Sequence, residues 1–484
     1  MFLNPFKKRH EETTLNIETI TNYTHFLELP LKFVACWDWY REPKCEREVM
    51  MNYLYLAVVL FALTSLPATL LTHLLTEWED VMSSLDKLAD GLPLLASLAI
   101  VTYFAMRKRQ LYNLTDFING RFRCHSARGL TNMTMLNSYR AARNFAYFYT
   151  ACTLFSVAMY VISPVIAHLW TKQPLQGWIY LDATTTAAIV CAFLKQCVGQ
   201  AIVGLAVGQL GVLFATHAIL LCGQIEMACC GLRNARCSAL LAAGVRHAAL
   251  AASHHHTHLL DDELHTYSYN VSEMKESRYH YDRPVANFRG HKTEFDIYSA
   301  EYDAGTCRAL AECARTLQTA GECRAQFQAL ASPLLALRVV QVTLYLCTLL
   351  YAATEVTSQI TIQTFNRKLW CCQALVNEGT SCLQKFDMVT VEYLAAVALD
   401  IFVYCYFGNQ IIIQAERVRG AVYGSGWQAM GARPRRLVLG LLLASGRGAA
   451  LRAGNFLPMD LHTFLVIIKT SFSYYTLLVN VNEK

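Results

Sequence analysis

The sequence carries little charge for its length. Asp, Glu, Lys and Arg make up 16% of its 484 residues, and hydrophobic residues make up 54%. Because soluble globular chains contain about 25% charged residues, this composition argues against a soluble protein and indicates several membrane spans. The formal net charge of +6 is small and scattered along the chain, so we expect no nucleic-acid partner.

The sequence also lacks the motifs that mark common enzyme classes. It has no GxSxG, HExxH or P-loop pattern, and no dinucleotide fingerprint in a strand–turn–helix context. We therefore predict no enzymatic activity, no catalytic residues and no cofactor. The 18 cysteines are dispersed, and several lie inside apolar runs. This pattern favours small buried hydrophobic side chains over a disulfide framework.

A signal peptide is missing as well, since the charged start MFLNPFKKRH is not followed by an apolar core. Residues 1–49 are therefore expected to be a cytoplasmic segment, in which residues 31–40 form a short amphipathic piece along the membrane. Later apolar runs are long enough for membrane-spanning helices. We place seven spans, at residues 50–75, 89–106, 145–170, 183–208, 332–354, 389–406 and 461–479.

Helical periodicity extends beyond the membrane in two places. The fourth helix continues towards residue 232, and a soluble helix at 306–330 precedes the fifth span. Between them, residues 233–305 read as a polar, His-rich loop. We expect the sixth span to end at Phe407-Gly408-Asn409 and a short apolar helix to follow at 437–451.

These features divide the chain into six parts. They are the cytoplasmic segment (1–49), four spans (50–208), an intracellular helix extension with the His-rich loop and an anchor helix (209–331), two spans joined by an extracellular loop (332–406), an intracellular anchor with the short helix (407–452), and the last span with an extracellular tail (453–484).

Basic residues set the expected orientation. The N-terminus, the loop after Arg107 and the loop at 417–436 are rich in Lys and Arg, whereas the loop after the first span is acidic. By the positive-inside rule the N-terminus is cytoplasmic and the C-terminus extracellular, which is the reverse of a G-protein-coupled receptor. Four sequons then fall on cytoplasmic segments and should carry no sugar; they are Asn22, Asn113, Asn132 and Asn270.

The long polar loop contains potential metal ligands, and the loop between the fifth and sixth spans contains cysteines that could form a disulfide. A structural metal site needs spaced ligands on a scaffold, whereas a histidine run in a polar loop is usually solvated, so we predict no metal site. The extracellular loop contains three cysteines, and a bridge from Cys382 to Cys371 or Cys372 stays open. The loop histidines are His254, His255, His256, His258, His265, His280 and His291.

The last span carries polar residues inside a segment long enough to cross a bilayer. Such groups could bond to neighbouring helices, or they could face water in a pore that a hydrophobic ring closes. The sequence alone leaves both interpretations open, and a pore would require several subunits around an axis. The residues at helical spacing are Thr463, Ile467, Thr470, Tyr474, Leu477 and Asn480 or Val481.

The C-terminal part resembles the signature of the insect odorant receptor family, and specifically its odour-tuning subunits rather than the shared coreceptor. The matching pieces occur in a fixed order, whereas the rest of the chain resembles the family mainly in the layout of its spans. The matches are Tyr404 to Asn409, Glu416 with Val418, Ala421 to Trp427, Gly454-Asn455-Phe456 through Pro458, and Lys469 to Leu478.

The resemblance favours the pore interpretation and implies an all-α, tetrameric, odorant-gated, non-selective cation channel for olfactory sensory transduction. Each subunit would contribute its last helix to a central pore, with Leu477 as the hydrophobic gate and Asn480 just outside it. The implied partners are the odorant receptor coreceptor, in a heterotetramer, or further copies of this chain. The implied location is the plasma membrane of olfactory neuron dendrites. Intracellular helices at 209–232, 306–330 and 410–451 would hold the subunits together.

A ligand pocket is expected between the outer halves of the second, third, fourth and sixth spans. Its aliphatic and aromatic walls suit a small volatile of low polarity. Two other classes stay open, a gustatory-type chemosensory channel and a metabotropic seven-span receptor. The candidate ligand-binding residues are Leu94, Ser97, Val157, Tyr160, Val198, Ile202, Tyr393 and Val397.

Overall fold

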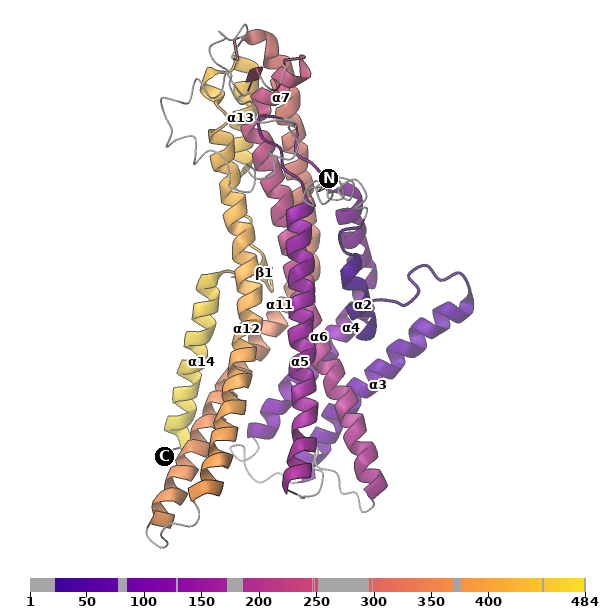
Figure 1. The fold of residues 1–484 in the computed structure, drawn as a ribbon, viewed down its shortest axis with the longest axis vertical. Coiled ribbons are helices and arrows are strands. Elements are labelled where there is room, and N and C mark those ends of the chain that lie inside the picture. The colour runs from indigo at the N-terminus through magenta and orange to yellow at the C-terminus, as the bar shows by residue number, and fades with distance from the viewer. Residues whose placement is uncertain are drawn as a thin grey trace, which may run out of the picture.

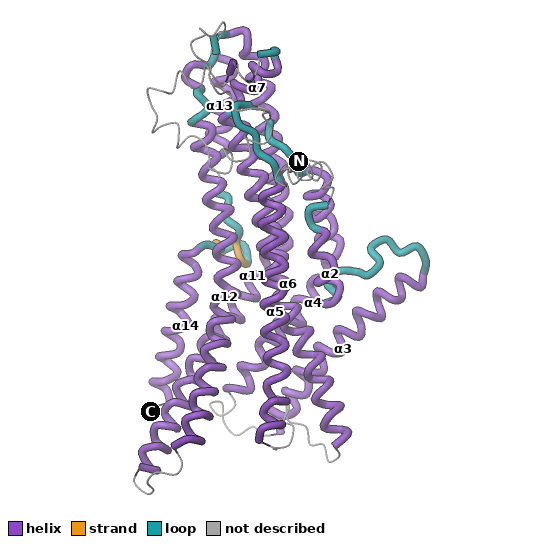
Figure 2. Tube along the Cα trace, in the orientation of Figure 1, coloured by secondary structure: helices purple, strands orange, loops and turns teal. Residues whose placement is uncertain are grey.

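The computed structural model describes residues 22–76, 85–127, 129–171, 186–245, 299–368, 376–445 and 448–482, together with 247, 249–250 and 296–297. In the described part the chain is almost entirely helical (Figures 1 and 2). The elements are α2 (His25–Phe33), α3 (Glu46–Thr76), α4 (Leu85–Arg121), α5 (Leu136–Thr171), α6 (Thr186–Arg233), α7 (Ala235–Ala242), η1 (Ala300–Tyr302), α11 (Asp303–Lys368), α12 (Val376–Tyr423), η2 (Trp427–Ala429), α13 (Ala432–Ser445), β1 (Arg452–Ala453), β2 (Leu457–Pro458) and α14 (Leu461–Asn482).

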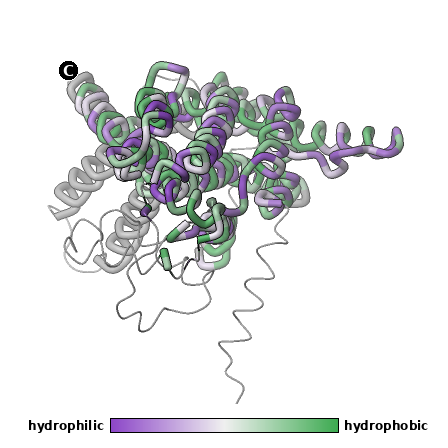
Figure 3. Tube along the Cα trace, turned by 90° about the horizontal axis from the view of Figure 1, so that it is seen from above, coloured by the Kyte–Doolittle hydropathy of each residue, from purple (hydrophilic) through white to green (hydrophobic). Residues whose placement is uncertain are grey.

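The fold is an all-α membrane protein. Within the described residues, five helices are long and apolar enough to cross a membrane: Glu46–Thr76, Leu136–Ile166, Ala188–Arg233, Ala300–Leu350 and Leu394–Ala429. Large apolar side chains lie exposed on these helices, for example Phe61 (72%) and Phe155 (68%), and the view down the bundle shows hydrophobic positions on its outer side (Figure 3). Apolar outer faces fit a lipid environment. The helices α4 and α14 are not among these five, so the number of seven spans stays a prediction.

The core lies where the long helices α6, α11 and α12 run together (Figure 1). Phe214 of α6 packs against Phe327 of α11 and Tyr404 of α12, with ring centroids 5.2 and 5.4 Å apart. All three side chains are almost completely buried. Around this core α5 packs along α6, and α14 packs on α11 and α12.

Glycines allow α6 to approach its neighbours closely. A β-carbon on Gly204 would overlap Val157 of α5, and one on Gly199 would stand 2.6 Å from Leu66 of α3. Close helix contacts through small residues are typical of membrane bundles, because no hydrophobic effect drives helices together in lipid.

The helix α11 corrects one sequence-based expectation. A soluble helix at 306–330 and a separate span from Ser332 were expected, but α11 is one continuous helix of 66 residues with Pro333 inside it. Carbonyl groups next to the proline bind other elements. Leu330 accepts a hydrogen bond from the Tyr103 hydroxyl of α4 (3.0 Å), and Ser332 accepts one from the Gly454 amide (3.0 Å). Both contacts lie in the turn just before the proline, and they join α11 to α4 and to the segment that precedes α14.

Two further boundaries differ from the sequence-based expectations. The helix that contains the sixth predicted span does not end at Phe407-Gly408-Asn409, since α12 continues to Tyr423. The stretch 233–305 is not loop throughout, because α7 lies at its start and most of α7 is buried. Arg236 of α7 is 4% exposed and donates to the carbonyl oxygens of Ile297 (2.6 Å) and Ser299 (2.6 Å). The short helix predicted at 437–451 corresponds to α13, which begins earlier, at Ala432.

The N-terminal part folds against α4 rather than forming one amphipathic helix over 31–40. The helix α2 ends at Phe33, and the following residues turn towards α4. There Trp37 packs against Tyr112 with ring centroids 4.9 Å apart, and Lys108 pairs with Asp38 at 2.5 Å. Cys36 is fully buried, and burial raises the pKa of its thiol to about 12.

Candidate functional site

A small β-hairpin attaches α14 to the rest of the molecule. Its strands β1 and β2 pair antiparallel, and its turn holds Gly454 and Asn455 with positive φ angles of 58° and 67°. The Asn455 side-chain oxygen accepts hydrogen bonds from Ser332 (3.2 Å) and Gln328 (3.2 Å) of α11. Glycine and asparagine are the residues that tolerate this left-handed conformation best. The Gly454-Asn455-Phe456 motif therefore fixes the start of α14 next to α11.

The first turn of α14 is capped by its own sequence. Asp460 accepts a hydrogen bond from the Thr463 amide (2.7 Å), and the Thr463 hydroxyl donates to the carbonyl of Pro458 (2.7 Å). An aspartate directly before a helix stabilises the free amide groups of the first turn. The hairpin and this cap together set the direction in which α14 leaves the bundle.

The predicted polar stripe of α14 changes its environment along the helix. Thr463 and Ile467 are only 3% and 4% exposed, whereas Tyr474 and Leu477 are 51% and 57% exposed. Thr470 lies between these extremes, and its hydroxyl donates to the Val466 carbonyl (2.7 Å) within the helix. The side chains of Asn480 and Val481 lie outside the described part of the chain.

Ser471, one position from the predicted stripe, belongs to the buried face of α14. It is 1% exposed, and its hydroxyl donates to the Ile467 carbonyl at 2.9 Å and contacts the Thr343 carbonyl of α11 at 3.4 Å. On the opposite side of the helix Lys469 and Ser473, two positions before and after Ser471, are exposed. In Figure 1, α14 lies at the edge of the bundle beside α12. One face of α14 therefore packs on the subunit, and another is left uncovered by this chain.

The candidate ligand-binding residues lie on four helices. Leu94 and Ser97 of α4 are buried, and the Ser97 hydroxyl donates to the Leu94 carbonyl at 2.8 Å. Val157 of α5 lies against Gly204 of α6, so its side chain takes part in helix packing. Tyr160 is partly buried.

The other candidates differ in exposure. Ile202 of α6 and Val397 of α12 are partly buried and pack against the main core. Val198 is 57% exposed, and the neighbouring Gly199 faces Leu66 of α3. The side chain of Tyr393 lies outside the described part of the chain. The eight candidates therefore remain a prediction for the ligand-binding site.

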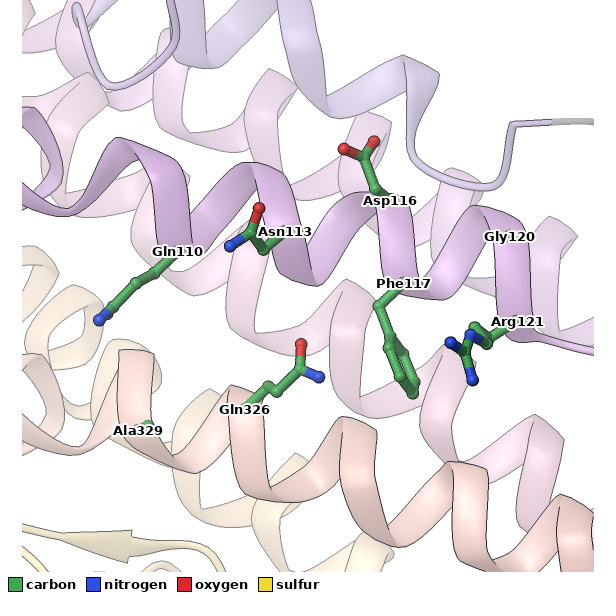
Figure 4. A pocket seen from close by; sticks show the side chains of 8 residues that line it. All are labelled: Gln110, Asn113, Asp116, Phe117, Gly120, Arg121, Gln326 and Ala329. Carbon is green, nitrogen blue, oxygen red and sulfur yellow. The ribbon is translucent and has the colours of Figure 1, made fainter.

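Two cavities in the described part lie away from these residues. The first, of about 610 Å³, separates α4 from α11, and its walls include Gln110, Asn113 and Gln326. Figure 4 shows Gln326 and Phe117 pointing into the gap between the two helices, while Asp116 points away; Asp116 pairs with Arg41 at 2.5 Å. The lining of this cavity mixes these three amide side chains with Phe117 and Ala329, and it contains none of the residues of the pocket predicted from the sequence.

The second cavity, of about 1080 Å³, lies between the segment after α4, α7 and the start of α11. Arg123, His247 and Arg308 line it together with Glu312, which pairs with Arg123. The Arg123 partner, with a smaller contribution from Arg315, lowers the pKa of the Glu312 carboxyl below its usual value.

Sequence reasoning missed a buried ion pair inside the bundle. Arg338 of α11 pairs with Asp400 of α12, and both side chains are less than a tenth exposed. The available signal was a single charge inside each of two apolar runs, SPLLALRVVQV and YLAAVALDIFVY. Ionisable residues in such runs usually face a partner or a functional cavity.

Comparison with known proteins agrees with this architecture. The family model described as 7tm Odorant receptor matches residues 379–472, which include most of α12, α13, the hairpin and part of α14. The chain is 25% identical to putative odorant receptor 85e of Drosophila melanogaster over 387 residues, which is 79% of this chain and 74% of that protein. It is 23% identical to odorant receptor 83a of the same species over 389 residues, or 80% of this chain and 78% of that protein.

Solved structures share the fold along the whole chain. The insect olfactory receptor OR5 from Machilis hrabei in complex with eugenol superposes with a TM-score of 0.59 at 12% identity, covering 98% of this chain and 99% of that one. A second structure of OR5 from Machilis hrabei superposes with a TM-score of 0.58 at 12% identity, covering 94% of this chain and 97% of that one. Together with the signature residues around α12 and α14, these comparisons show that the chain is similar to insect odorant receptors in sequence and in fold.

Proposed function

We propose that this chain is an odour-tuning subunit of an odorant-gated, non-selective cation channel. The observation that carries the proposal is α14, which packs one face on α11 and α12 and leaves Tyr474 and Leu477 more than half exposed. A helix of this kind at the edge of a subunit can line a pore once several subunits assemble around an axis. Leu477 is then the hydrophobic gate, with Thr470, Tyr474, Asn480 and Val481 along the pore wall.

The channel is a tetramer of this chain with the odorant receptor coreceptor, or of this chain alone. Its subunits meet through the intracellular helices at the ends of α6, α11, α12 and through α13. Support comes from α13, where Leu439 and Leu443 are 58% and 74% exposed beside Arg433 and Arg436. An exposed apolar patch with a polar rim is typical of an interaction surface.

The ligand is a small volatile of low polarity that binds among α4, α5, α6 and α12. The candidate wall is apolar apart from Ser97 and the tyrosines, and the Ser97 hydroxyl is used within its own helix. Such a site recognises shape through dispersion contacts. Opening follows when the ligand binds the dilated state better than the closed state and shifts the population towards it. OR5, which shares the fold, has been solved with eugenol, so eugenol is a suitable first probe.

The membrane is the plasma membrane of an olfactory neuron dendrite, with the N-terminus in the cytoplasm and the C-terminus outside. The relatives favour this function over the gustatory-type channel and the metabotropic receptor, because those described here are odorant or olfactory receptors.

Whole-cell recording tests the proposal directly. Cells would express the full chain with and without the coreceptor, and eugenol and a panel of small esters, ketones and aldehydes would be applied. We expect an odorant-evoked cation current without a second messenger, and antibody access to a C-terminal tag on intact cells. A tag that is reached only after permeabilisation, or a response that needs a G protein, contradicts the proposal.

A further inference from the structure

A buried polar cluster joins three helices inside the bundle. Arg338 of α11 forms an ion pair with Asp400 of α12, and a second guanidinium nitrogen of Arg338 donates to the side-chain oxygen of Gln341. The Tyr149 hydroxyl of α5 donates to the other carboxylate oxygen of Asp400 at 3.4 Å. Arg338, Gln341 and Asp400 are 3%, 7% and 6% exposed.

The surroundings of this cluster are apolar. Ile401 and Tyr404 of α12 are completely buried beside it, and Tyr149 lies 3.5 Å from the position of a β-carbon on Gly211. Burying two charges costs desolvation energy that hydrophobic residues of the same size would avoid. A buried pair in a membrane helix is therefore weak support for a purely stabilising role and instead favours a functional one.

The pair lies between the proposed ligand region and α14. On α12, Val397 precedes Asp400 by about one helical turn, and Phe402 follows it and packs against Phe464 of α14 with ring centroids 5.4 Å apart. On α11, the Thr343 carbonyl beyond Arg338 contacts the Ser471 hydroxyl of α14 at 3.4 Å. Both helices that support α14 are thus joined to each other near their contacts with it.

We propose that the Arg338–Asp400 ion pair couples ligand binding to the position of α14. It prevents α11 and α12 from sliding past each other. A displacement of α12 near Val397 is therefore transmitted to α14. Arg338 and Asp400 are positioning residues in this role, and neither touches ligand or permeating ions. The inference rests on the proposed channel function and adds the element that transmits the signal within one subunit.

Four forms of the chain separate coupling from stability. Asp400→Asn leaves the Arg338 guanidinium without a counter-ion, and Arg338→Gln leaves the Asp400 carboxylate without one. We therefore expect less receptor at the cell surface for each single variant. The double variant Arg338→Gln/Asp400→Asn has no unpaired charge and should regain surface abundance. The matched control is Arg41→Gln/Asp116→Asn, which removes a solvent-exposed ion pair outside the helices proposed to join the subunits, with side chains 35% and 59% exposed.

The readout is the current evoked by eugenol and by the odorant panel, divided by the amount of receptor at the surface. For the double variant we expect normal surface abundance. The odorant concentration for half-maximal current should rise by about 5- to 150-fold, the usual range of coupling between sites, or the maximal current should be lost. The control should match the wild type in both quantities. If the double variant regains both abundance and the wild-type half-maximal concentration, the pair is structural and the inference fails.

A second variant keeps the test decisive if the double variant does not reach the surface. Tyr149→Phe removes one hydrogen bond to Asp400 and changes little else, and its expected effect is a shift of about 2- to 10-fold in the same direction. An unchanged dose–response curve for Tyr149→Phe would then overturn the proposal. A wild-type chain that gives no odorant current with or without the coreceptor contradicts the channel function itself, whereas wild-type current with unchanged variants contradicts only the coupling.

Discussion

Gly408 of α12 lies directly against the carbonyl oxygen of Met459, the residue that joins the β-hairpin to α14. A β-carbon at position 408 would overlap that oxygen and stand 3.0 Å from the Met459 β-carbon. Since the obstacle is backbone, it cannot move aside as a flexible side chain could. Gly408 thus marks the place where the start of α14 docks on α12, and this contact explains a glycine within the Phe407-Gly408-Asn409 motif.

Gly408→Ala should therefore destabilise the attachment of α14. Overpacked sites typically cost about 1–3 kcal/mol, and we expect a lower melting temperature of the purified full-length protein with a smaller odorant current per surface receptor. The control is Gly420→Ala on the same helix, where a β-carbon meets nothing within 4 Å. It should be neutral or slightly stabilising, because alanine favours helix over glycine. Equal melting temperatures for the two variants would contradict the docking contact.

Gly204→Ala should weaken the contact between α5 and α6. The new methyl group would overlap Val157, a β-branched side chain with little freedom to rotate, so a loss of about 1–3 kcal/mol is expected. Gly120→Ala in α4 has open space around it and serves as the control. Thermal melts followed by fluorescence-detected size exclusion measure both. The prediction is wrong if Gly204→Ala melts at or above the Gly120→Ala temperature.

Leu477→Ser should raise the basal current. A hydrophobic ring closes a pore by excluding water, and a hydroxyl at that level would hydrate the constriction. We expect an increase of several-fold in current without odorant, normalised to surface abundance. Leu465→Ser changes an equally exposed leucine of the same helix, with 54% against 57% exposure, and should leave the basal current unchanged. Equal increases in basal current for both substitutions would show that Leu477 is not the gate residue.

Cys36 and Cys45 should differ sharply in thiol reactivity. Burial raises the pKa of the Cys36 thiol to about 12, so at pH 8 only about one molecule in ten thousand would carry the thiolate that reacts. Cys45 is exposed. Treatment of the folded protein with iodoacetamide, followed by peptide mass spectrometry, should show Cys45 modified and Cys36 spared until the protein is unfolded. Early modification of Cys36 would show that the segment after α2 does not pack on α4 as described.

The Arg123–Glu312 ion pair should make a small contribution to stability that depends on pH. Hydrogen bonding to Arg123 lowers the pKa of Glu312 from its ordinary value of 4.5. A lowered pKa in the folded state means that the contribution is present above about pH 4.5 and is lost as the pH falls through the folded-state value. Because the pair is solvent-exposed, its size should stay below about 1 kcal/mol. Glu312→Gln should melt slightly below the wild type at pH 7, and the difference should vanish in acid; a difference that grows in acid would contradict the assignment.

The apolar runs were sufficient to predict an all-helical membrane protein, because membrane-spanning length and hydropathy are local properties. The apolar runs did not predict where the helices end, because helix ends depend on contacts with residues distant in the sequence. Gly408 reads as a helix terminator in the sequence, yet α12 continues past it to Tyr423, since the glycine makes room for Met459. Pro333 likewise lies inside α11 without ending it.

The candidate site could be predicted only in part for the same reason. Helical spacing places Thr463 and Leu477 on one stripe, but only tertiary packing decides that the first is buried and the second exposed. The Arg338–Asp400 pair joins residues 62 positions apart, and a single sequence contains no signal that links them. The short helix α7 was missed because its eight residues are too few for a clear helical period, although the hydrogen bonds of Arg236 anchor it firmly.

The unbroken course of α11 has a mechanical consequence. At 66 residues the helix is roughly 100 Å long, so in the proposed channel it would act as a lever between the subunit contacts near its start and the opposite end of the bundle. A tilt of about 5° at its inner end would carry its outer end by roughly 9 Å over that length. In the proposed assembly, small adjustments between neighbouring subunits where α11 begins would become larger displacements at its far end. A change of partner subunit alone would then alter the geometry of a ligand site there.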